Sequence, residues 1–243
     1  MKMEQIDSKI NDVYCSFFMP KKEIKKVLIT IHGFAGDKES STIKEIAKKL
    51  TKGNTLVVAF DLPSHGEDNT KLELKECYDY LDRVIKHVIS SYNNDISFFA
   101  TSFGGYILLN YLNKTNIKFN KIILRAPAVF MDEILINNIL KEHGYTKDDL
   151  NTKNINLGFE KELMIDKSFY NDLLNNKINN INNEYAYNII QGKKDDVVDY
   201  KKNEEFFKGN AKNYRFFYME NADHRFKNKG ELESIVNIVS SIM

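Results

Sequence analysis

Cysteine is scarce in this 243-residue chain. Its two cysteines, Cys15 and Cys77, could make at most one bridge, so a fold held together by several disulfides is excluded. Residues 1–19 also lack the apolar core and the small-residue cleavage site of a secretory signal. These absences predict a cytoplasmic protein with free thiols.

Long apolar runs and an excess of one charge are missing as well. Hydrophobic residues make up 42% of the chain, yet no run approaches the roughly 18 residues that span a membrane. Lys plus Arg total 35 against 34 for Asp plus Glu, and no basic stripe could neutralise a row of phosphates. A transmembrane protein is therefore excluded, and nucleic acid is not expected as a partner.

The length fits one large domain with an insertion, or two small domains, at roughly 150 residues per domain. Short runs of β-forming residues predict strands at 27–31, 55–60, 96–100 and 121–124. Apolar residues at helical spacing predict helices between them at 42–50, 74–89 and 105–112. This alternation predicts an α/β fold, a parallel sheet covered by helices.

Both ends of the chain extend this pattern. Residues 6–10 and 13–19 flank the turn-favouring pair Asn11-Asp12 and predict a hairpin at the sheet edge. Towards the carboxyl end, the alternation predicts strands at 185–191 and 214–219 and helices at 200–208 and 231–243.

Residues 130–184 interrupt the alternation. Helical pieces at 133–141 and 167–174 alternate with polar stretches, and the pattern predicts no strand. We therefore interpret 130–184 as a small helical cap, inserted into a core domain made of residues 1–129 and 185–243.

The most informative segment is 100–105, Ala-Thr-Ser-Phe-Gly-Gly, where a buried strand turns directly into a helix. Small residues stand two positions before and two positions after Ser102, as required where strand and helix approach closely. The segment resembles a nucleophile elbow, which strains the backbone of a serine and exposes its hydroxyl above the sheet. Ala100 departs from the usual glycine, but its single methyl still permits a close approach.

An acid and a base follow two later strands. Asp195 lies in segment 192–198 after one predicted strand, and His224 lies in segment 222–226 after the next. Ligand sites in open α/β sheets gather at the carboxyl ends of strands, so both should project with Ser102 into one crevice. The order serine, acid, base resembles that of the α/β-hydrolase superfamily, over nearly the whole chain.

Two further loops strengthen this resemblance. The segment His32-Gly33-Phe34 resembles the oxyanion loop of the superfamily, and residues 61–68 resemble the loop after its fourth strand. Ser64 and Asp68 depart from the residues usual in that second loop. The resemblance implies a mostly parallel sheet of about eight strands, flanked by helices and carrying a small helical cap.

The resemblance also implies catalytic roles. A serine hydroxyl is too weakly acidic to attack unaided, so His224 would accept its proton, while Asp195 would orient the imidazole and stabilise its cation. The oxyanion hole is assigned to the backbone amides of Phe34 and Phe103. Asp196 is a competing acid, but the family places the acid three residues after a glycine, which favours Asp195.

Metal and nucleotide sites are not indicated. His32 and His65 belong to the loop motifs and lack Cys, His or carboxylate partners at recognisable ligand spacing. Residues 192–194, Gly-Lys-Lys, lack the rest of a phosphate-binding loop, and no G-x-G-x-x-G run opens a helix. We expect neither a metal nor a cofactor.

Within the superfamily, the His-Gly-Phe loop, the small cap and the Ala-Asp-His ending look most similar to bacterial feruloyl and cinnamoyl esterases and to serine-aminopeptidase-like hydrolases. The resemblance implies hydrolysis of a small-molecule carboxylic ester through an acyl-serine intermediate. Acyl transfer, thioester cleavage and peptide cleavage on the same triad stay open, and so does a non-catalytic binding member of the fold. The substrate and the oligomeric state, a homodimer included, are not fixed by these motifs.

Overall fold

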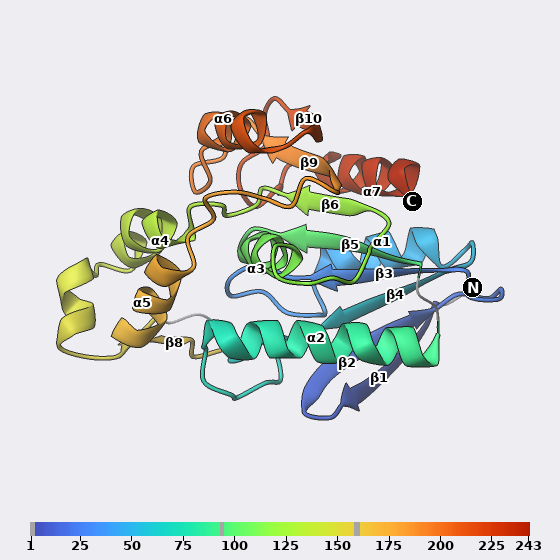
Figure 1. The fold of residues 1–243 in the computed structure, drawn as a ribbon, viewed down its shortest axis with the longest axis horizontal. Coiled ribbons are helices and arrows are strands. Elements are labelled where there is room, and N and C mark those ends of the chain that lie inside the picture. Colours follow the sequence, from blue (N-terminus) through green and yellow to red (C-terminus); the bar gives the residue numbers. More distant parts are fainter. Residues whose placement is uncertain (1–2, 93–94, 158–160) are drawn as a thin grey trace.

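The computed structural model describes residues 3–92, 95–157 and 161–243, and one eight-stranded sheet lies at its centre (Figure 1). The strands are ordered β1-β2-β4-β3-β5-β6-β9-β10. Their bounds are Glu4–Ile10 (β1), Val13–Met19 (β2), Lys26–Ile31 (β3), Thr55–Phe60 (β4), Ile96–Thr101 (β5), Ile122–Arg125 (β6), Ala186–Gly192 (β9) and Asn213–Met219 (β10). β2 pairs antiparallel with β1 and β4, and every neighbour pair from β4 to β10 is parallel. The predicted α/β fold with a mostly parallel sheet is confirmed.

The hairpin at the sheet edge forms where the sequence predicts it. Asn11 begins the turn with φ of +53°, a left-handed conformation that asparagine tolerates better than most residues. β1 is largely exposed, whereas β2 is largely buried because it also pairs with β4. The hairpin thus joins the parallel sheet through its second strand.

Helices cover both faces of the sheet (Figure 1). One face carries α1 (Ser41–Leu50) and α7 (Glu231–Ile242), and the other carries α2 (Leu74–Ser91), α3 (Phe103–Leu112) and α6 (Tyr200–Asn210). Successive strand residues alternate between the two cores, as in β5, where Phe98 packs with the second group and Phe99 with the first. No helix within the described residues is long and apolar enough to cross a membrane.

The segment between β6 and β9 lies beyond the carboxyl ends of the central strands (Figure 1). It contains α4 (Met131–Ile134), a π-helical stretch (Leu135–Leu140), a 3₁₀ turn (Lys147–Asn151), β7 (Ile155–Asn156), β8 (Met164–Ile165) and α5 (Lys167–Asn175). The expectation that residues 130–184 hold no strand is wrong, because β7 and β8 pair antiparallel. A strand of two residues is too short to show the alternation of apolar and polar residues by which strands are predicted from sequence. They are held instead by packing, since Ile155 and Ile165 are both buried.

Helix α3 begins two residues earlier than its apolar pattern predicts. Phe103 is its first residue, directly after Ser102, whereas the pattern starts at Gly105. Glycine is a poor helix former, so the first turn carries no propensity signal. This early start places the amino end of α3 against the serine.

Candidate active site

The turn between β5 and α3 holds Ser102 in an unusual conformation. Its φ is +49° and its ψ is −114°, outside the regions that a non-glycine residue normally occupies. A Cβ on Gly104 would lie 2.4 Å from the carbonyl oxygen of His32, so glycine is required there. Ala100, where the superfamily usually has glycine, is fully buried within β5. The local structure is therefore the strained strand-turn-helix that exposes a hydroxyl above the sheet.

Asp195 and His224 reach the same point from two loops. Asp195 follows β9 and His224 follows β10. The two loops approach closely at Gly192, where a Cβ would lie 2.4 Å from the carbonyl oxygen of Ala222. Nε2 of His224 lies 3.1 Å from Ser102 Oγ, and Nδ1 lies 2.9 Å from Asp195 Oδ2. The structure thus brings the three sequence-predicted side chains into one hydrogen-bonded chain.

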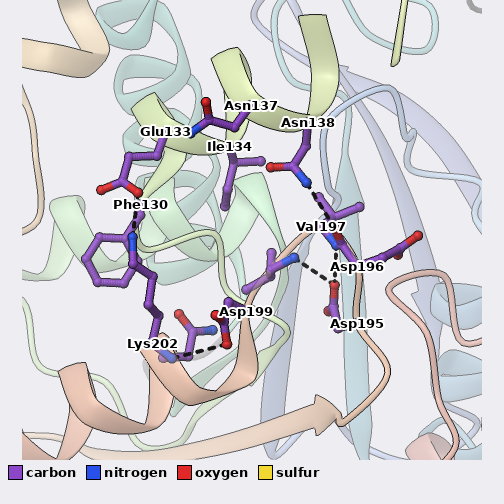
Figure 2. Close-up of a pocket in the computed structure, with 12 residues that line it drawn as sticks. Phe130, Glu133, Ile134, Asn137, Asn138, Asp195, Asp196, Val197, Asp199 and Lys202 are labelled. Carbon is purple, nitrogen blue, oxygen red and sulfur yellow. Dashed lines mark hydrogen bonds and ion pairs between the residues drawn. The ribbon is translucent and has the colours of Figure 1, made fainter. Parts of the chain in front are cut away.

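The carboxylate of Asp195 is fully buried and well supplied with donors. The backbone amides of Val197 and Val198 donate to its Oδ1 at 3.0 and 2.7 Å. Asp196 differs, because it is exposed and its carbonyl oxygen accepts a hydrogen bond from the Asn138 side chain. Figure 2 shows both residues on this loop. Of the two adjacent acids, the structure directs Asp195 to the histidine.

A sequence model of the serine aminopeptidase S33 family matches residues 22–151, more than half of the chain. The protein belongs to this family of α/β-hydrolases. The matched residues include the loop after β3, the turn that carries Ser102 and the start of the segment that follows β6. A search of curated proteins finds no significant match.

Solved structures of other α/β-hydrolases share this fold. Est1E from Butyrivibrio proteoclasticus, solved with ferulic acid bound, is 18% identical with a TM-score of 0.76, over 97% of this chain and 98% of that one. The α/β-hydrolase GrgF from Penicillium sp. sh18 is 14% identical with a TM-score of 0.76, over 100% of this chain and 98% of that one. Mouse α/β-hydrolase domain-containing protein 10 is 15% identical with a TM-score of 0.70, over 100% of this chain and 98% of that one. These similarities establish the fold of this S33 family member.

Two amides that the sequence motifs do not indicate support the acid. Gln191 donates from Nε2 to Asp195 Oδ2 at 3.2 Å, and Asn203 of α6 donates from Nδ2 to Gln191 Oε1 at 3.1 Å. Both amide residues are fully buried. A polar residue near the end of an otherwise apolar buried strand is the signal that could have singled out Gln191. Together these amides connect the acid of this α/β-hydrolase to α6.

Phe34 and Phe103 both belong to segments that contact the serine. Phe103 is the first residue of α3, and the first-turn amides of a helix have no acceptor within the helix. The loop that carries Phe34 touches the serine, since a Cβ on the preceding Gly33 would lie 3.2 Å from Ser102 Cβ. The two phenyl rings meet edge to face with centroids 5.7 Å apart. Phe103 thus follows Ser102 directly, and Phe34 lines the same cavity as Ser102.

His32 and His65 are buried in the loops after β3 and β4. The Leu62 amide donates to His32 Nε2 at 3.0 Å, so Nδ1 carries the proton and donates to the Gly33 carbonyl at 2.8 Å. His65 Nδ1 lies 2.8 Å from the Pro63 carbonyl. Burial lowers the pKa of His32 to about 4 and that of His65 to about 3. Both rings are neutral structural links, and no group of three potential metal ligands occurs in the part of the chain that the structure describes.

We expect the free energy of unfolding to fall when the pH is lowered from about 6.5, where an unfolded histidine titrates, towards 4. The pKa of His65 is depressed to about 3 by burial, so below pH 6.5 the unfolded state binds a proton that the folded state excludes. Its contribution is fully present above pH 6.5 and is lost in acid. Urea unfolding at pH 7.5 and 4.5 measures the difference, which His65→Gln should reduce by about 3 kcal/mol. An equal pH dependence in both proteins would contradict this assignment.

A cavity of about 540 Å³ opens over the serine and the histidine. The segment after β6 contributes Met131, Ile134 and Ile139 to its lining, and Phe34 adds an aromatic wall. A second pocket of about 330 Å³ is lined by residues of the 195–199 loop, α4, α6 and the π-helical stretch (Figure 2). Neither Ser102 nor His224 lines that pocket, whereas both line the 540 Å³ cavity.

Proposed function

We propose that this protein is a serine hydrolase of carboxylic esters, with Ser102 as nucleophile, His224 as general base and acid, and Asp195 as the orienting acid. The observation that carries the proposal is the continuous hydrogen-bonded chain from Ser102 Oγ through both imidazole nitrogens to Asp195 Oδ2. This arrangement of a nucleophile, a base and an orienter can activate an alcohol at neutral pH.

Acylation follows from the geometry. As Ser102 Oγ attacks the ester carbonyl carbon, its proton passes to Nε2 of His224, and the carbonyl electrons move to the oxygen. The buried carboxylate of Asp195 holds Nδ1 and stabilises the imidazolium that forms. The amides of Phe34 and Phe103 are the proposed donors to the oxyanion. When the tetrahedral intermediate collapses, Nε2 returns the proton to the leaving alcohol, and an acyl-serine remains.

Deacylation reverses these roles with water. His224 Nε2 takes a proton from a water that attacks the acyl carbon, and the carbonyl electrons again move to the oxygen. Collapse of this second intermediate breaks the bond to Ser102 Oγ, which recovers its proton from Nε2. The products are a carboxylic acid and an alcohol, and the proposed steps use no cofactor.

One observation disfavours the aminopeptidase alternative, and another disfavours a cysteine nucleophile. The family model is described as a serine aminopeptidase, and an aminopeptidase must bind the free ammonium group of its substrate. The charged lining of the cavity is mainly cationic, with Arg125, Arg225 and Lys227 against Glu142, so an ammonium group is poorly matched. A cysteine nucleophile is also disfavoured, because burial raises the pKa of Cys15 to about 12.

We further propose that residues 130–184 act as a cap on a core formed by 1–129 and 185–243. Met131, Ile134 and Ile139 contribute apolar residues to the lining of the cavity that also contains Ser102 and His224. Apolar walls with a few polar groups suit the acyl or aryl part of a small ester. Est1E, a neighbour of the same fold, was solved with ferulic acid bound.

Labelling with a fluorophosphonate tests the proposed function directly. We expect one adduct per chain by intact mass, and peptide mapping should place it on Ser102, because the probe reacts with an activated serine without requiring the true substrate. A matched set of phenyl acetate, S-phenyl thioacetate, acetanilide and alanine anilide then compares ester, thioester, amide and amino-peptide bonds. We expect phenyl acetate to be cleaved with the highest kcat/KM.

A folded protein that neither takes up the probe nor hydrolyses the set would overturn the proposed function in favour of a non-catalytic member of the fold. Labelling combined with preferential cleavage of alanine anilide would favour the aminopeptidase alternative. Circular dichroism on the same samples provides the check that the protein is folded.

A further inference from the structure

Arg125 stands beside the nucleophile, although none of the motifs includes it. It is the last residue of β6, paired in register with Thr101 of β5, and its carbonyl oxygen accepts a hydrogen bond from the Ser102 amide at 2.9 Å. Adjacent strands lie about 4.8 Å apart, so the two backbones are immediate neighbours. The side chain of Arg125 lines the same 540 Å³ cavity as Ser102 and His224.

The guanidinium of Arg125 has few partners. Its Nη1 donates to Thr42 Oγ1 at 3.1 Å, and its Cζ lies 5.3 Å from the centre of the Phe226 ring. Its Nε is buried and has no hydrogen-bond partner within the described residues. A guanidinium carries five N–H donors and no acceptor, and arginine is rarely buried without a carboxylate partner. Within the described residues the terminal Nη2 also forms no hydrogen bond, so this side chain, whose residue lines the cavity, keeps unused donors.

Nearby charges do not satisfy these donors. Asp195 attracts Arg125 through space, but its oxygens already accept hydrogen bonds from the triad histidine, from Gln191 and from two backbone amides. Glu142, which also lines the cavity, is largely exposed and lies 3.9 Å from Arg225. Burial lowers the pKa of Arg125 only to about 10, so the guanidinium is cationic at neutral pH.

We propose that Arg125 binds a carboxylate of the substrate, so that the natural ester of this enzyme carries an acidic group near the scissile bond. The planar fork of a guanidinium matches a carboxylate with two parallel hydrogen bonds. The exposed Arg225 and Lys227 at the same cavity add positive charge that attracts an anion. This inference rests on the proposed function and narrows it to acidic esters.

A role in packing alone does not account for these contacts. The aliphatic stem of an arginine can fill space beside Phe226, but methionine would fill it without burying a charge. An unpartnered buried Nε lowers stability unless a ligand uses it or its neighbours. The position of Arg125 in the lining of the cavity that contains the nucleophile is what distinguishes a binding role.

Two pairs of esters that differ only in charge test the inference. The acyl-side pair is monophenyl adipate and the phenyl ester of adipamic acid, and the alcohol-side pair is 4-acetoxybenzoate and 4-acetoxybenzamide. Each pair replaces a carboxylate with a carboxamide of similar shape. We expect wild-type kcat/KM to favour the carboxylate in at least one pair by ~10-fold to ~100-fold, the usual range for a charged hydrogen-bonded contact.

In Arg125→Met the ratio of kcat/KM values should fall to about the ratio of the two esters' uncatalysed hydrolysis rates. Arg125→Lys should keep only part of the preference, because a single ammonium cannot form two parallel hydrogen bonds. Arg215→Met is the matched control. Arg215 lies exposed on β10, away from the cavity, so its loss should leave the preference unchanged. Wild-type protein without a preference in either pair, or a preference that survives in Arg125→Met, would overturn the inference.

A readout without turnover separates this inference from the proposed function. Adipate and 4-hydroxybenzoate, the products of the two acidic esters, should slow fluorophosphonate labelling of the wild-type serine, whereas adipamide and 4-hydroxybenzamide should not. Arg125→Met should lose this protection. Labelling without any protection by the acids, and without a carboxylate preference in turnover, overturns carboxylate binding and leaves the serine hydrolase intact. Absence of both labelling and hydrolysis in folded protein instead overturns the proposed function.

Discussion

With Ser102 replaced by alanine, kcat for phenyl acetate is expected to fall by about 10⁶-fold, the loss typical of removing the nucleophile from a serine hydrolase triad. No acyl-enzyme can form, because the variant has no Oγ to bond to the carbonyl carbon. Residual hydrolysis would come from substrate binding and from the oxyanion donors, with water as the nucleophile. Initial rates, measured at enzyme concentrations high enough for turnover to exceed background hydrolysis, give this loss.

The fold should survive the change at Ser102. Alanine keeps the Cβ, so the positive φ of +49° is equally strained in both proteins. The hydroxyl forms one side-chain hydrogen bond, to His224, and we expect the free energy of unfolding to change by less than about 1 kcal/mol. Ser90→Ala on the exposed surface of α2 serves as the matched control and should retain full activity. Residual kcat above about 1% of wild type would place the nucleophile elsewhere.

The sequence predicts this much of the site because each residue of the proposed triad lies in a local pattern. Ser102 lies between a buried strand and small residues, and Asp195 and His224 each come directly after a strand. In a parallel sheet the carboxyl ends of neighbouring strands meet at one edge, so chain position alone brings distant residues together. The predicted strand bounds agree with the observed ones to within two residues. For the central strands this is because buried parallel strands are continuous apolar runs.

The remaining parts of the site depend on pairing across strands and helices. Gln191 supports the acid only because Asn203 of α6 lies against the end of β9, a contact that no local spacing reports. Arg125 reaches the cavity because β6 lies directly beside β5. In the sequence it is a single charged residue after an apolar run, which is equally typical of a solvated strand end. Side-chain partners chosen by tertiary packing are thus what the sequence leaves open.

Replacing Asp195 with asparagine is expected to lower kcat by about 10⁴-fold while leaving the fold intact, the cost known for the wrong imidazole tautomer in serine hydrolase triads. The amide oxygen of asparagine can still accept from the amides of Val197 and Val198, which now donate to Oδ1. Its NH₂ group would then occupy the Oδ2 position, where it would face His224 Nδ1 and could no longer accept from Gln191 Nε2. Nδ1 would become the acceptor and Nε2 would carry the proton, so the histidine could no longer take a proton from the serine.

Asp196→Asn is the matched control for this prediction, because the two acids are adjacent and only Asp195 contacts the histidine. We expect Asp196→Asn to retain kcat within a factor of about two, as usual for an exposed charge away from the reacting atoms. Fluorophosphonate labelling should slow in Asp195→Asn in parallel with kcat, since both reactions need Nε2 free to accept a proton. A larger loss in Asp196→Asn than in Asp195→Asn would assign the acid to the exposed residue. It would also require the 192–198 loop to rearrange, because the Asp195 carboxylate is held by four hydrogen bonds in the present structure.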